Sequence, residues 1–234
     1  GAIGIEFASF YNDLGVDITV VEVLDRILPA EDIDISNFAL KSFEKQGIKI
    51  KTSSMVKSLK TSKGKISVQI ETMAGLEEVS VEKVILAVGI IGNTENLGLE
   101  NTSAKVSNGQ LVVDKWGATH EPGLHAIGDL VGAPWLAHKA SHEGVICVER
   151  IAGVEKVHPL DYSNIPGCTY SRPQVASVGL TQKLAEDAGY KVRVGHFPFI
   201  GNGKAIALGE MDGFVKTVFD ATTGELLGAH MIGA

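Results

Sequence analysis

Residues 1–22 read GAIGIEFASFYNDLGVDITVVE, and this stretch decides the fold. Apolar side chains at helical spacing predict a helix over residues 2–14, which Gly15 would end. The run at residues 17–22 is apolar and β-branched, as in the buried strands of parallel sheets. A helix that leads into such a strand indicates an α/β fold with right-handed parallel crossovers.

The first four residues carry a nucleotide-binding signal. Gly1 and Gly4 match the end of the G-x-G-x-x-G motif, where one glycine lets the backbone approach a pyrophosphate and another lets the helix pack on a strand. The helix N-terminus would offer N–H groups and a positive dipole end to the phosphates. Glu22 ends the next strand, about where the motif places the acid that binds the ribose. A carboxylate there accepts from a 2′-hydroxyl and repels a 2′-phosphate, so NAD is favoured over NADP.

Glu6 lies on the first turn of this predicted helix, and two interpretations of it stay open. It would lie near the nicotinamide end of a bound cofactor, or it would only complement the positive end of the helix dipole. The sequence does not distinguish between these interpretations.

The alternation of helix and strand continues beyond this stretch. We expect a helix over residues 33–46 and a short strand over 48–51. Polar and apolar residues then alternate with period two, which predicts a three-stranded antiparallel meander over residues 56–60, 65–70 and 78–81. VILAV at residues 84–88 predicts a buried strand that ends at Gly89.

A second candidate site is LHAIGD at residues 124–129. We expect short strands over 111–114 and 124–127. The second strand would place the carboxylate of Asp129 at the carboxyl edge of a sheet, where ligands of α/β proteins bind. Such a carboxylate can accept hydrogen bonds from a sugar or ribityl hydroxyl. A long helix is predicted over residues 138–152.

The last third of the chain has the pattern of an α+β layer with antiparallel strands. Residues 153–161 are expected to form a linker. The elements expected after it are a strand over 169–178, a helix over 181–188 capped by Thr181, a strand over 192–197, and a hairpin of strands over 214–219 and 226–231.

The composition excludes several classes of protein. A net charge of −7 and a pI near 5.5 argue against a nucleic-acid partner, because phosphate binding needs a basic surface. The apolar runs are too short to cross a bilayer. The two cysteines, Cys147 and Cys168, are not closely spaced, and we interpret both as buried structural thiols in a reducing compartment. His138 and His142 lack a third metal ligand nearby, so we expect surface histidines and no metal site.

Several short motifs resemble one family, the pyridine nucleotide-disulfide oxidoreductases. They are GAIGIE at residues 1–6, AIGD at 126–129, LAHKA at 136–140 and EG at 143–144. The last third is similar to the dimerisation domain of the dihydrolipoamide dehydrogenase branch of that family. The residues that carry this similarity are GHFPF at 195–199, NGKA at 202–205 and LGAH at 227–230. The resemblance extends over essentially the whole chain.

This resemblance implies three domains and two cofactors, NAD and FAD. It implies a Rossmann-like NAD-binding domain with an antiparallel β-meander at residues 1–89, a central domain with an FAD-contacting segment at 90–156, and an α+β dimerisation domain at 157–234. The implied NAD site consists of Gly1, Gly4, Glu6, Glu22, Val56 and Gly89. The implied FAD site consists of Asp129, which would bind the ribityl chain, and of Trp135, Leu136, Ala137 and His138, whose backbone would approach the flavin ring. A helix N-terminus there would stabilise negative charge on the reduced flavin.

The resemblance also implies parts that lie outside these residues. An FAD domain with a redox-active cysteine pair is expected before Gly1, together with the central strand of the nucleotide-binding sheet. A catalytic His-Glu pair is expected after Ala234. No catalytic residue is therefore expected in this chain, and the segment alone is expected to be inactive. The implied reaction is thiol–disulfide exchange with dihydrolipoamide, electron transfer to FAD and hydride transfer to NAD.

The implied partners follow from the same resemblance. The protein is expected to be a homodimer and a component of a 2-oxo acid dehydrogenase complex, which presents dihydrolipoyl groups as the substrate. No nucleic acid and no membrane is expected as a partner. The expected location is the cytoplasm, or the mitochondrial matrix in a eukaryote.

The chain departs from the family pattern at two places, and two other functions stay open. After Gly89, relatives carry Arg and Pro where this chain has IIGN at residues 90–93, so no cation would contact the NAD pyrophosphate there. YSRPQV at residues 170–175 replaces the usual Thr-His-Pro-Glu-Val. One alternative function is a sibling reductase of the glutathione or mercuric reductase type, which Glu22 disfavours because those enzymes usually take NADPH. The other is a non-catalytic nucleotide-binding or dimerisation module.

Overall fold

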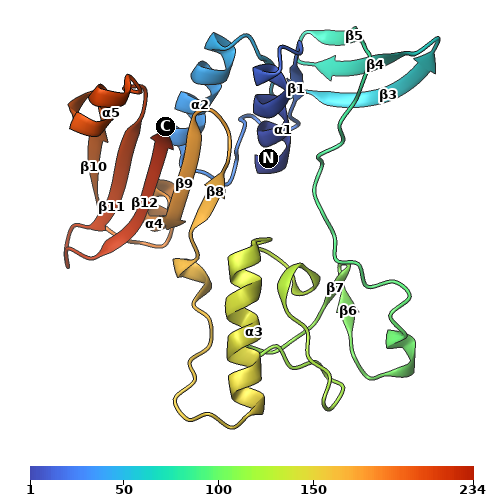
Figure 1. Ribbon diagram of the computed structural model, residues 1–234, viewed down its shortest axis with the longest axis vertical. Helices are drawn as coiled ribbons and strands as arrows, with labels where there is room; N and C mark the ends of the chain where they lie inside the picture. Colours follow the sequence, from blue (N-terminus) through green and yellow to red (C-terminus); the bar gives the residue numbers. More distant parts are fainter. The chain divides into compact units, whose positions relative to one another are not determined.

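A computed structural model describes residues 1–234, which divide into two units. The first unit comprises residues 1–88 and 166–234, and the second comprises residues 89–165. The predicted nucleotide-binding and dimerisation parts therefore pack into one unit, although they lie far apart in the sequence (Figure 1). No helix of this chain has the length and apolar character that a bilayer span requires.

The nucleotide-binding part begins with the predicted alternation of helix and strand. Its elements are α1 (Ala2–Asp13), β1 (Thr19–Val21), α2 (Ile33–Lys45) and β2 (Lys49–Lys51). β1 and β2 pair in parallel, with Val20 opposite Ile50, so the predicted parallel crossover is confirmed. The buried faces of the two helices meet in one apolar core that includes Ile5, Ile35 and Phe43.

The predicted meander is also confirmed. Its strands are β3 (Met55–Ser62), β4 (Lys65–Thr72) and β5 (Gly75–Val81). They form a three-stranded antiparallel sheet in the order β3-β4-β5. Few of its side chains are buried, among them Val68 and Ile70 on the central strand, as expected of a sheet with solvent on most of its surface.

The prediction of a buried strand at residues 84–88 is wrong. This segment is not a strand, and Leu86 and Val88 are 77% and 84% exposed. An apolar run becomes a buried strand only when neighbouring strands satisfy its backbone N–H and C=O groups. β1 and β2 pair only with each other, so no strand of this part satisfies the backbone groups of residues 84–88.

The last third of the chain forms a five-stranded antiparallel sheet. Its strands are β8 (Gly167–Thr169), β9 (Gln174–Gly179), β10 (Val192–Pro198), β11 (Phe214–Asp220) and β12 (Leu226–Gly233), in the order β10-β11-β12-β9-β8 (Figure 1). The predicted hairpin of β11 and β12 is confirmed. The helix α4 (Gln182–Asp187) begins at the predicted cap, because the Thr181 side chain accepts a hydrogen bond from the Leu184 amide.

Two features of this sheet differ from the prediction. The single strand expected over residues 169–178 is two antiparallel strands, β8 and β9, joined by a tight turn. Pro173 has no N–H to donate to a ladder, and the Ser171 hydroxyl donates to the Pro173 carbonyl inside the turn. The short helix α5 (Gly203–Leu208) was not predicted from the sequence, and its cap is Asn202, whose side chain accepts from two backbone amides.

Helix α2 covers one face of this sheet. Phe214, Ile232 and Val175 of the sheet belong to the same buried core as α1 and α2. The rings of Phe38 and Phe214 meet edge to face, with centroids 5.5 Å apart. The nucleotide-binding part and the antiparallel layer therefore share one apolar core.

The second unit has little regular structure apart from one helix. Its elements are the short strands β6 (Val106–Ser107) and β7 (Gln110–Leu111), the helix α3 (Ala137–Ile151), and the 3-10 helices η1 (Leu99–Asn101), η2 (Gly128–Val131) and η3 (Tyr162–Asn164). A fourth, η4 (Phe199–Gly201), lies in the first unit. The predicted helix at 138–152 is confirmed.

The predicted strands at 111–114 and 124–127 are largely wrong. Only Leu111 of the first belongs to a strand, and the second is reduced to one isolated bridge between Ala118 and His125. The reason is local. The Asp114 side chain accepts hydrogen bonds from the amides of Trp116 and Ala118, so a turn replaces a continuous ladder.

Candidate functional site

The first candidate site lies at the N-terminus of α1. The Glu22 carboxylate reaches this helix end, because its Oε2 lies 3.2 Å from the Gly1 nitrogen. Its Oε1 accepts from the Leu24 amide at 3.1 Å, and the side chain is 15% exposed. The structure therefore brings together the two predicted residues that are 21 positions apart, Gly1 and Glu22.

The two glycines of this motif have different surroundings. A Cβ added to Gly1 would meet no atom within 4 Å. A Cβ added to Gly4 would lie 3.5 Å from the Ala87 Cβ, which is an ordinary contact. The packing at Gly4 is therefore looser than the motif predicts, and an alanine would fit there.

Glu6 has a partner that neither interpretation of the sequence included. Its Oε1 accepts from the Tyr170 amide at 2.8 Å, and one turn further along α1 the Ser9 hydroxyl accepts from the Arg172 amide at 2.9 Å. Arg172 also pairs with Asp13, whose Oδ1 lies 2.7 Å from the guanidinium. This side of α1 therefore holds the turn between β8 and β9.

Two further residues of the predicted NAD site are exposed. Val56 lies on β3, is 42% exposed and adjoins an irregularity in the pairing with β4. Gly89 has φ of +118°, a conformation that favours glycine, and open space around it. Neither residue is buried by neighbouring side chains.

The second candidate site joins the η2 loop to the start of α3. Asp129 lies in η2 and its side chain is exposed. Trp135, Leu136, Ala137 and His138 lead into α3, which begins at Ala137 and has no side-chain cap. The loop and the helix meet because the Lys139 ammonium, in the first turn of α3, bonds to the Gly128 and Gly132 carbonyls at 3.0 and 2.9 Å. The predicted FAD residues are therefore collected at one end of the helix.

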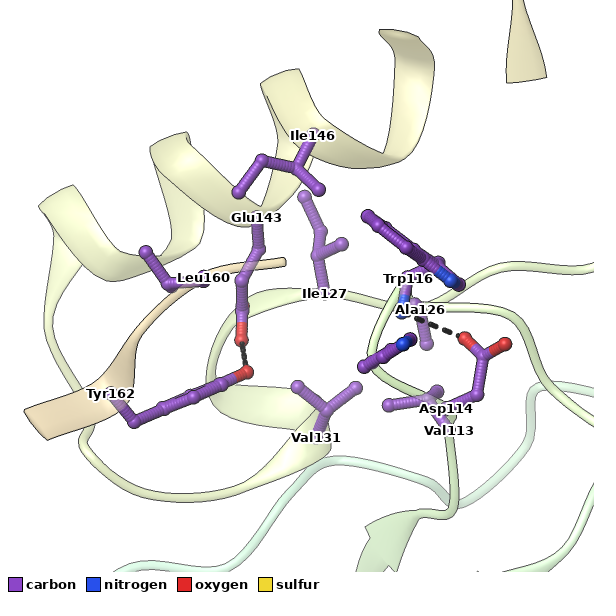
Figure 2. A pocket seen from close by; sticks show the side chains of 12 residues that line it. Val113, Asp114, Trp116, Ala126, Ile127, Val131, Glu143, Ile146, Leu160 and Tyr162 are labelled. Carbon is purple, nitrogen blue, oxygen red and sulfur yellow. Dashed lines mark hydrogen bonds between the residues drawn. The ribbon is translucent and has the colours of Figure 1, made fainter. Parts of the chain in front are cut away.

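A buried ion pair lies beneath this loop. Lys139 and Glu143 are one helical turn apart, with side chains 1% and 8% exposed and 3.2 Å between Nζ and Oε1. Glu143 Oε2 accepts from the Gly128 amide at 2.7 Å, and Oε1 accepts from the Tyr162 hydroxyl at 2.5 Å. Figure 2 shows Glu143 and Tyr162 meeting on one side of a small pocket. Burial and the negative charge of Glu143 raise the pKa of Tyr162 to about 12.

The rest of this pocket is lined by the turn from Asp114 to Gly117 and by apolar side chains that include Ile127 and Ile146. Cys147, which lies near this turn, is buried, and burial and the charge of Asp114 raise the pKa of its thiol. A thiol with a raised pKa is a poor nucleophile at neutral pH. Its prediction as a buried structural thiol is confirmed.

The same prediction is wrong for Cys168, which is exposed on β8. β8 lies at the edge of the sheet and has a neighbour on one side only. His138 and His142 were predicted to lie on the surface, and both are exposed. No cluster of three or more His, Cys, Asp or Glu side chains is arranged to hold a metal.

The donor sets of the two sites fit the predicted cofactors. At α1, a half-buried carboxylate beside the N-terminus of a helix suits a ribose hydroxyl and an adjoining phosphate. At α3, an exposed carboxylate beside a helix end without a side-chain cap suits a hydroxylated chain and an electron-rich ring. The residues present therefore fit NAD at the first site and FAD at the second.

The sequence analysis missed two buried charged clusters. Lys139 and Glu143 were part of a motif, and their i,i+4 spacing could have indicated an ion pair. No local signal connects Tyr162 to them. The second cluster is Lys216, on β11, whose ammonium lies 2.8 Å from Asp32 and 2.6 Å from Asp34. These partners are more than 180 positions apart, and no spacing rule reaches that far.

Comparison with known proteins gives two matching family models and many relatives. The model for pyridine nucleotide-disulphide oxidoreductases matches residues 1–144, and the model for the dimerisation domain of these proteins matches residues 165–234. The dihydrolipoyl dehydrogenases of Rhizobium etli and Zymomonas mobilis are 55% and 53% identical to this chain over its whole length. The chain covers 49% and 50% of those two proteins, and so spans about half of their length.

Solved structures of flavoprotein disulfide reductases also resemble this chain over its whole length. The crystal structure of LpdA from Mycobacterium tuberculosis superposes with a TM-score of 0.90 at 28% identity, covering 100% of this chain and 50% of that one. The flavoprotein disulfide reductase RclA from Escherichia coli superposes with a TM-score of 0.91 at 26% identity, covering 100% of this chain and 53% of that one.

Proposed function

This chain belongs to the pyridine nucleotide-disulphide oxidoreductase family, and on that premise we propose that it is the nucleotide-binding and dimerisation part of a dihydrolipoyl dehydrogenase. The observation that carries the proposal is the Glu22 carboxylate beside Gly1, at the N-terminus of α1. A NAD-specific site needs an acid at that place, whereas the sibling reductases that take NADPH need to accept a 2′-phosphate there.

In the proposed NAD site each residue has a separate task. Glu22 accepts a hydrogen bond from the 2′-hydroxyl of the adenosine ribose and excludes a phosphate from that position. Gly1 leaves space for the pyrophosphate at the end of α1, where the helix dipole favours negative charge. Gly4, Glu6, Val56 and Gly89 complete the site. Of these, Glu6 is positioned by its bond to the Tyr170 amide.

In the proposed FAD site the chain supplies a carboxylate and a helix end. Asp129 would accept hydrogen bonds from the ribityl hydroxyls. The flavin would be held by the backbone of Trp135, Leu136, Ala137 and His138, and the N-terminus of α3 would favour negative charge on it. FAD, when bound, would supply the electron relay between a dithiol and NAD.

We assign no catalytic residue to residues 1–234. Both cysteines are free, and Cys147 is buried with a raised pKa. The redox cysteines and the base that ionises the dithiol substrate would belong to the rest of the full-length protein. The proposed domain order is NAD-binding at 1–89, FAD-contacting at 90–156 and dimerisation at 157–234.

The proposed partners follow from the same assignment. The full-length protein would be a cytoplasmic homodimer that forms through the layer matched by the dimerisation model. It would oxidise dihydrolipoyl groups within a 2-oxo acid dehydrogenase complex. A sedimentation measurement at micromolar concentration checks the assembly, and a monomer there would contradict it.

Steady-state kinetics of the full-length protein test the reaction. We expect oxidation of dihydrolipoamide with NAD, a bound flavin, and little activity with NADP. Reduction of glutathione disulfide or mercuric ion by NADPH, without dihydrolipoamide oxidation, would assign the protein to the sibling reductases. If the protein binds a nucleotide tightly but turns over none of these substrates, it would be a non-catalytic nucleotide-binding module.

A further inference from the structure

Lys139 is a buried lysine that contacts the loop directly. Its side chain is 1% exposed, and its ammonium donates hydrogen bonds to the Gly128 and Gly132 carbonyls at 3.0 and 2.9 Å. It also forms an ion pair with Glu143 Oε1 at 3.2 Å. Two of its three N–H groups are therefore committed to the loop.

Glu143 completes the hold on the same loop from the other side. Its Oε2 accepts from the Gly128 amide, so that both backbone groups of Gly128 are fixed, one by Glu143 and one by Lys139. Its Oε1 accepts from the Tyr162 hydroxyl, which fixes the orientation of the carboxylate. The Lys139 ammonium also lies 6.0 Å from the centre of the Tyr162 ring.

The loop itself has little preference for one conformation. Gly128 and Gly132, at its two ends, have φ of +76° and +112°, and glycine loses more conformational freedom on folding than any other residue. Lys139 and Glu143 make three hydrogen bonds to the backbone of these two glycines. A buried ion pair contributes little more to stability than an apolar pair of the same volume, so stability alone does not account for the charges.

We propose that Lys139, Glu143 and Tyr162 form a positioning group for FAD. They set the conformation of the loop from Gly128 to Gly132, and thereby the place of the Asp129 carboxylate, without touching the cofactor themselves. This inference rests on the proposed function, in which Asp129 binds the ribityl chain. It predicts that FAD affinity depends on three residues that lie beneath the loop.

The test uses the full-length protein, with the FAD Kd measured by flavin fluorescence during reconstitution of the apoprotein. Tyr162→Phe removes one hydroxyl and keeps the ring, and we expect it to raise the FAD Kd by about 3- to 10-fold. Lys139→Met removes the charge, and we expect an increase of about 100-fold. In both variants hydrogen exchange at residues 128–132 should become faster, while the KM for NAD stays within about twofold.

Lys216→Met is the matched control, because Lys216 is also 1% exposed and also paired with carboxylates, but lies in the other unit. We expect it to lower thermal stability and to leave the FAD Kd unchanged. An equal loss of FAD affinity in Lys216→Met would overturn the proposal, since general destabilisation would then explain both effects. If Lys139→Met does not fold, Tyr162→Phe decides the question alone.

A further variant separates this inference from the proposed function. Asp129→Asn should weaken FAD binding if Asp129 is the ribityl ligand. If Asp129→Asn weakens binding but Tyr162→Phe changes neither the FAD Kd nor the exchange of the loop, the positioning role is wrong and the proposed function stands. If Asp129→Asn has no effect, Asp129 is not the ribityl ligand and the positioning role falls with that assignment, whereas steady-state kinetics still decide the reaction of the protein.

Discussion

The carboxylate of Asp32 and the ammonium of Lys216 form a buried ion pair, with 2.8 Å between Oδ1 and Nζ and both side chains 1% exposed. Asp32 is the N-cap of α2, where its side chain also accepts from the Asp34 amide. Lys216 lies in the middle of β11. This ion pair therefore helps to connect the nucleotide-binding part to the antiparallel sheet, in addition to their shared apolar core.

Removing one partner of this pair should be strongly destabilising. Lys216→Met leaves Asp32 as an uncompensated buried charge, and we expect the free energy of unfolding of the full-length protein to fall by about 3–5 kcal/mol. The control is Lys183→Met, because Lys183 pairs with Asp187 on the exposed face of α4 and is 79% exposed. That change should cost less than about 0.5 kcal/mol. Thermal unfolding of the two variants checks the difference, and equal midpoints would contradict it.

The same pair should contribute constant stability over a wide range of pH. Burial alone would raise the pKa of Asp32, but the hydrogen bond from Lys216 and those from two backbone amides lower it below its ordinary value. Burial alone would lower the pKa of Lys216, but its hydrogen bonds to Asp32 and Asp34 raise it above its ordinary value. A carboxyl with a lowered pKa loses its contribution only as the pH falls through that pKa, and an amine with a raised pKa only as the pH rises through it.

The pair should therefore act at full strength between about pH 4 and pH 10, the ordinary pKa values of Asp and Lys. The measurement is the difference in unfolding midpoint between the unmodified protein and the double variant Asp32→Asn/Lys216→Met across that range. Burial raises the pKa of Glu31 and the charge of Asp32 raises it further, so the double variant also changes the titration of Glu31. A difference that halves between pH 6 and pH 8 would show that another group controls the pair.

How much could be predicted from the sequence depends on how far apart the cooperating residues lie. The three long helices were predicted to within two residues at each end, because the apolar period of a helix is a local property. The segment at 84–88 has an equally clear apolar run, but a buried strand depends on neighbours that the run does not contain. The matched family models confirm the predicted fold class.

In the candidate sites, too, contacts between residues close in sequence could be predicted and contacts between distant residues could not. The meeting of Gly1 and Glu22 was predictable, because a parallel crossover brings the end of a strand beside the start of the preceding helix. The role of Tyr162 was not predictable. Its hydroxyl reaches Glu143 only because residues 153–161 fold back along α3. The partnership of Lys216 with Asp32 depends on the packing of two parts that are separated by a whole unit of the chain.

The glycine of the LGAH motif at residues 227–230 has a steric role that can be tested. A Cβ added to Gly228 would lie 2.1 Å from the carbonyl oxygen of Leu180, which is backbone and cannot move aside alone. We expect Gly228→Ala to lower the free energy of unfolding by about 1–3 kcal/mol, as overpacking does elsewhere. Gly167→Ala on β8 is the control, because its Cβ would meet only the Ser177 hydroxyl at 3.9 Å. Wild-type stability in Gly228→Ala, measured by urea unfolding, would show that the strand shifts to accept the methyl group.

The position of Glu22 predicts the choice of nucleotide. In Glu22→Gln the side chain keeps an acceptor for a 2′-hydroxyl but loses the charge that repels a 2′-phosphate. We therefore expect kcat/KM of the full-length protein for NADP to rise about tenfold, with a smaller loss for NAD.

The control for this change is Glu44→Gln, which removes one negative charge from the exposed surface of α2. It alters the net charge of the protein by the same amount but lies away from the end of α1. If Glu44→Gln improves NADP use as much as Glu22→Gln does, the preference comes from the overall charge of −7. If only Glu22→Gln does so, and the effect persists at high salt where distant charges are screened, the carboxylate beside Gly1 selects the cofactor.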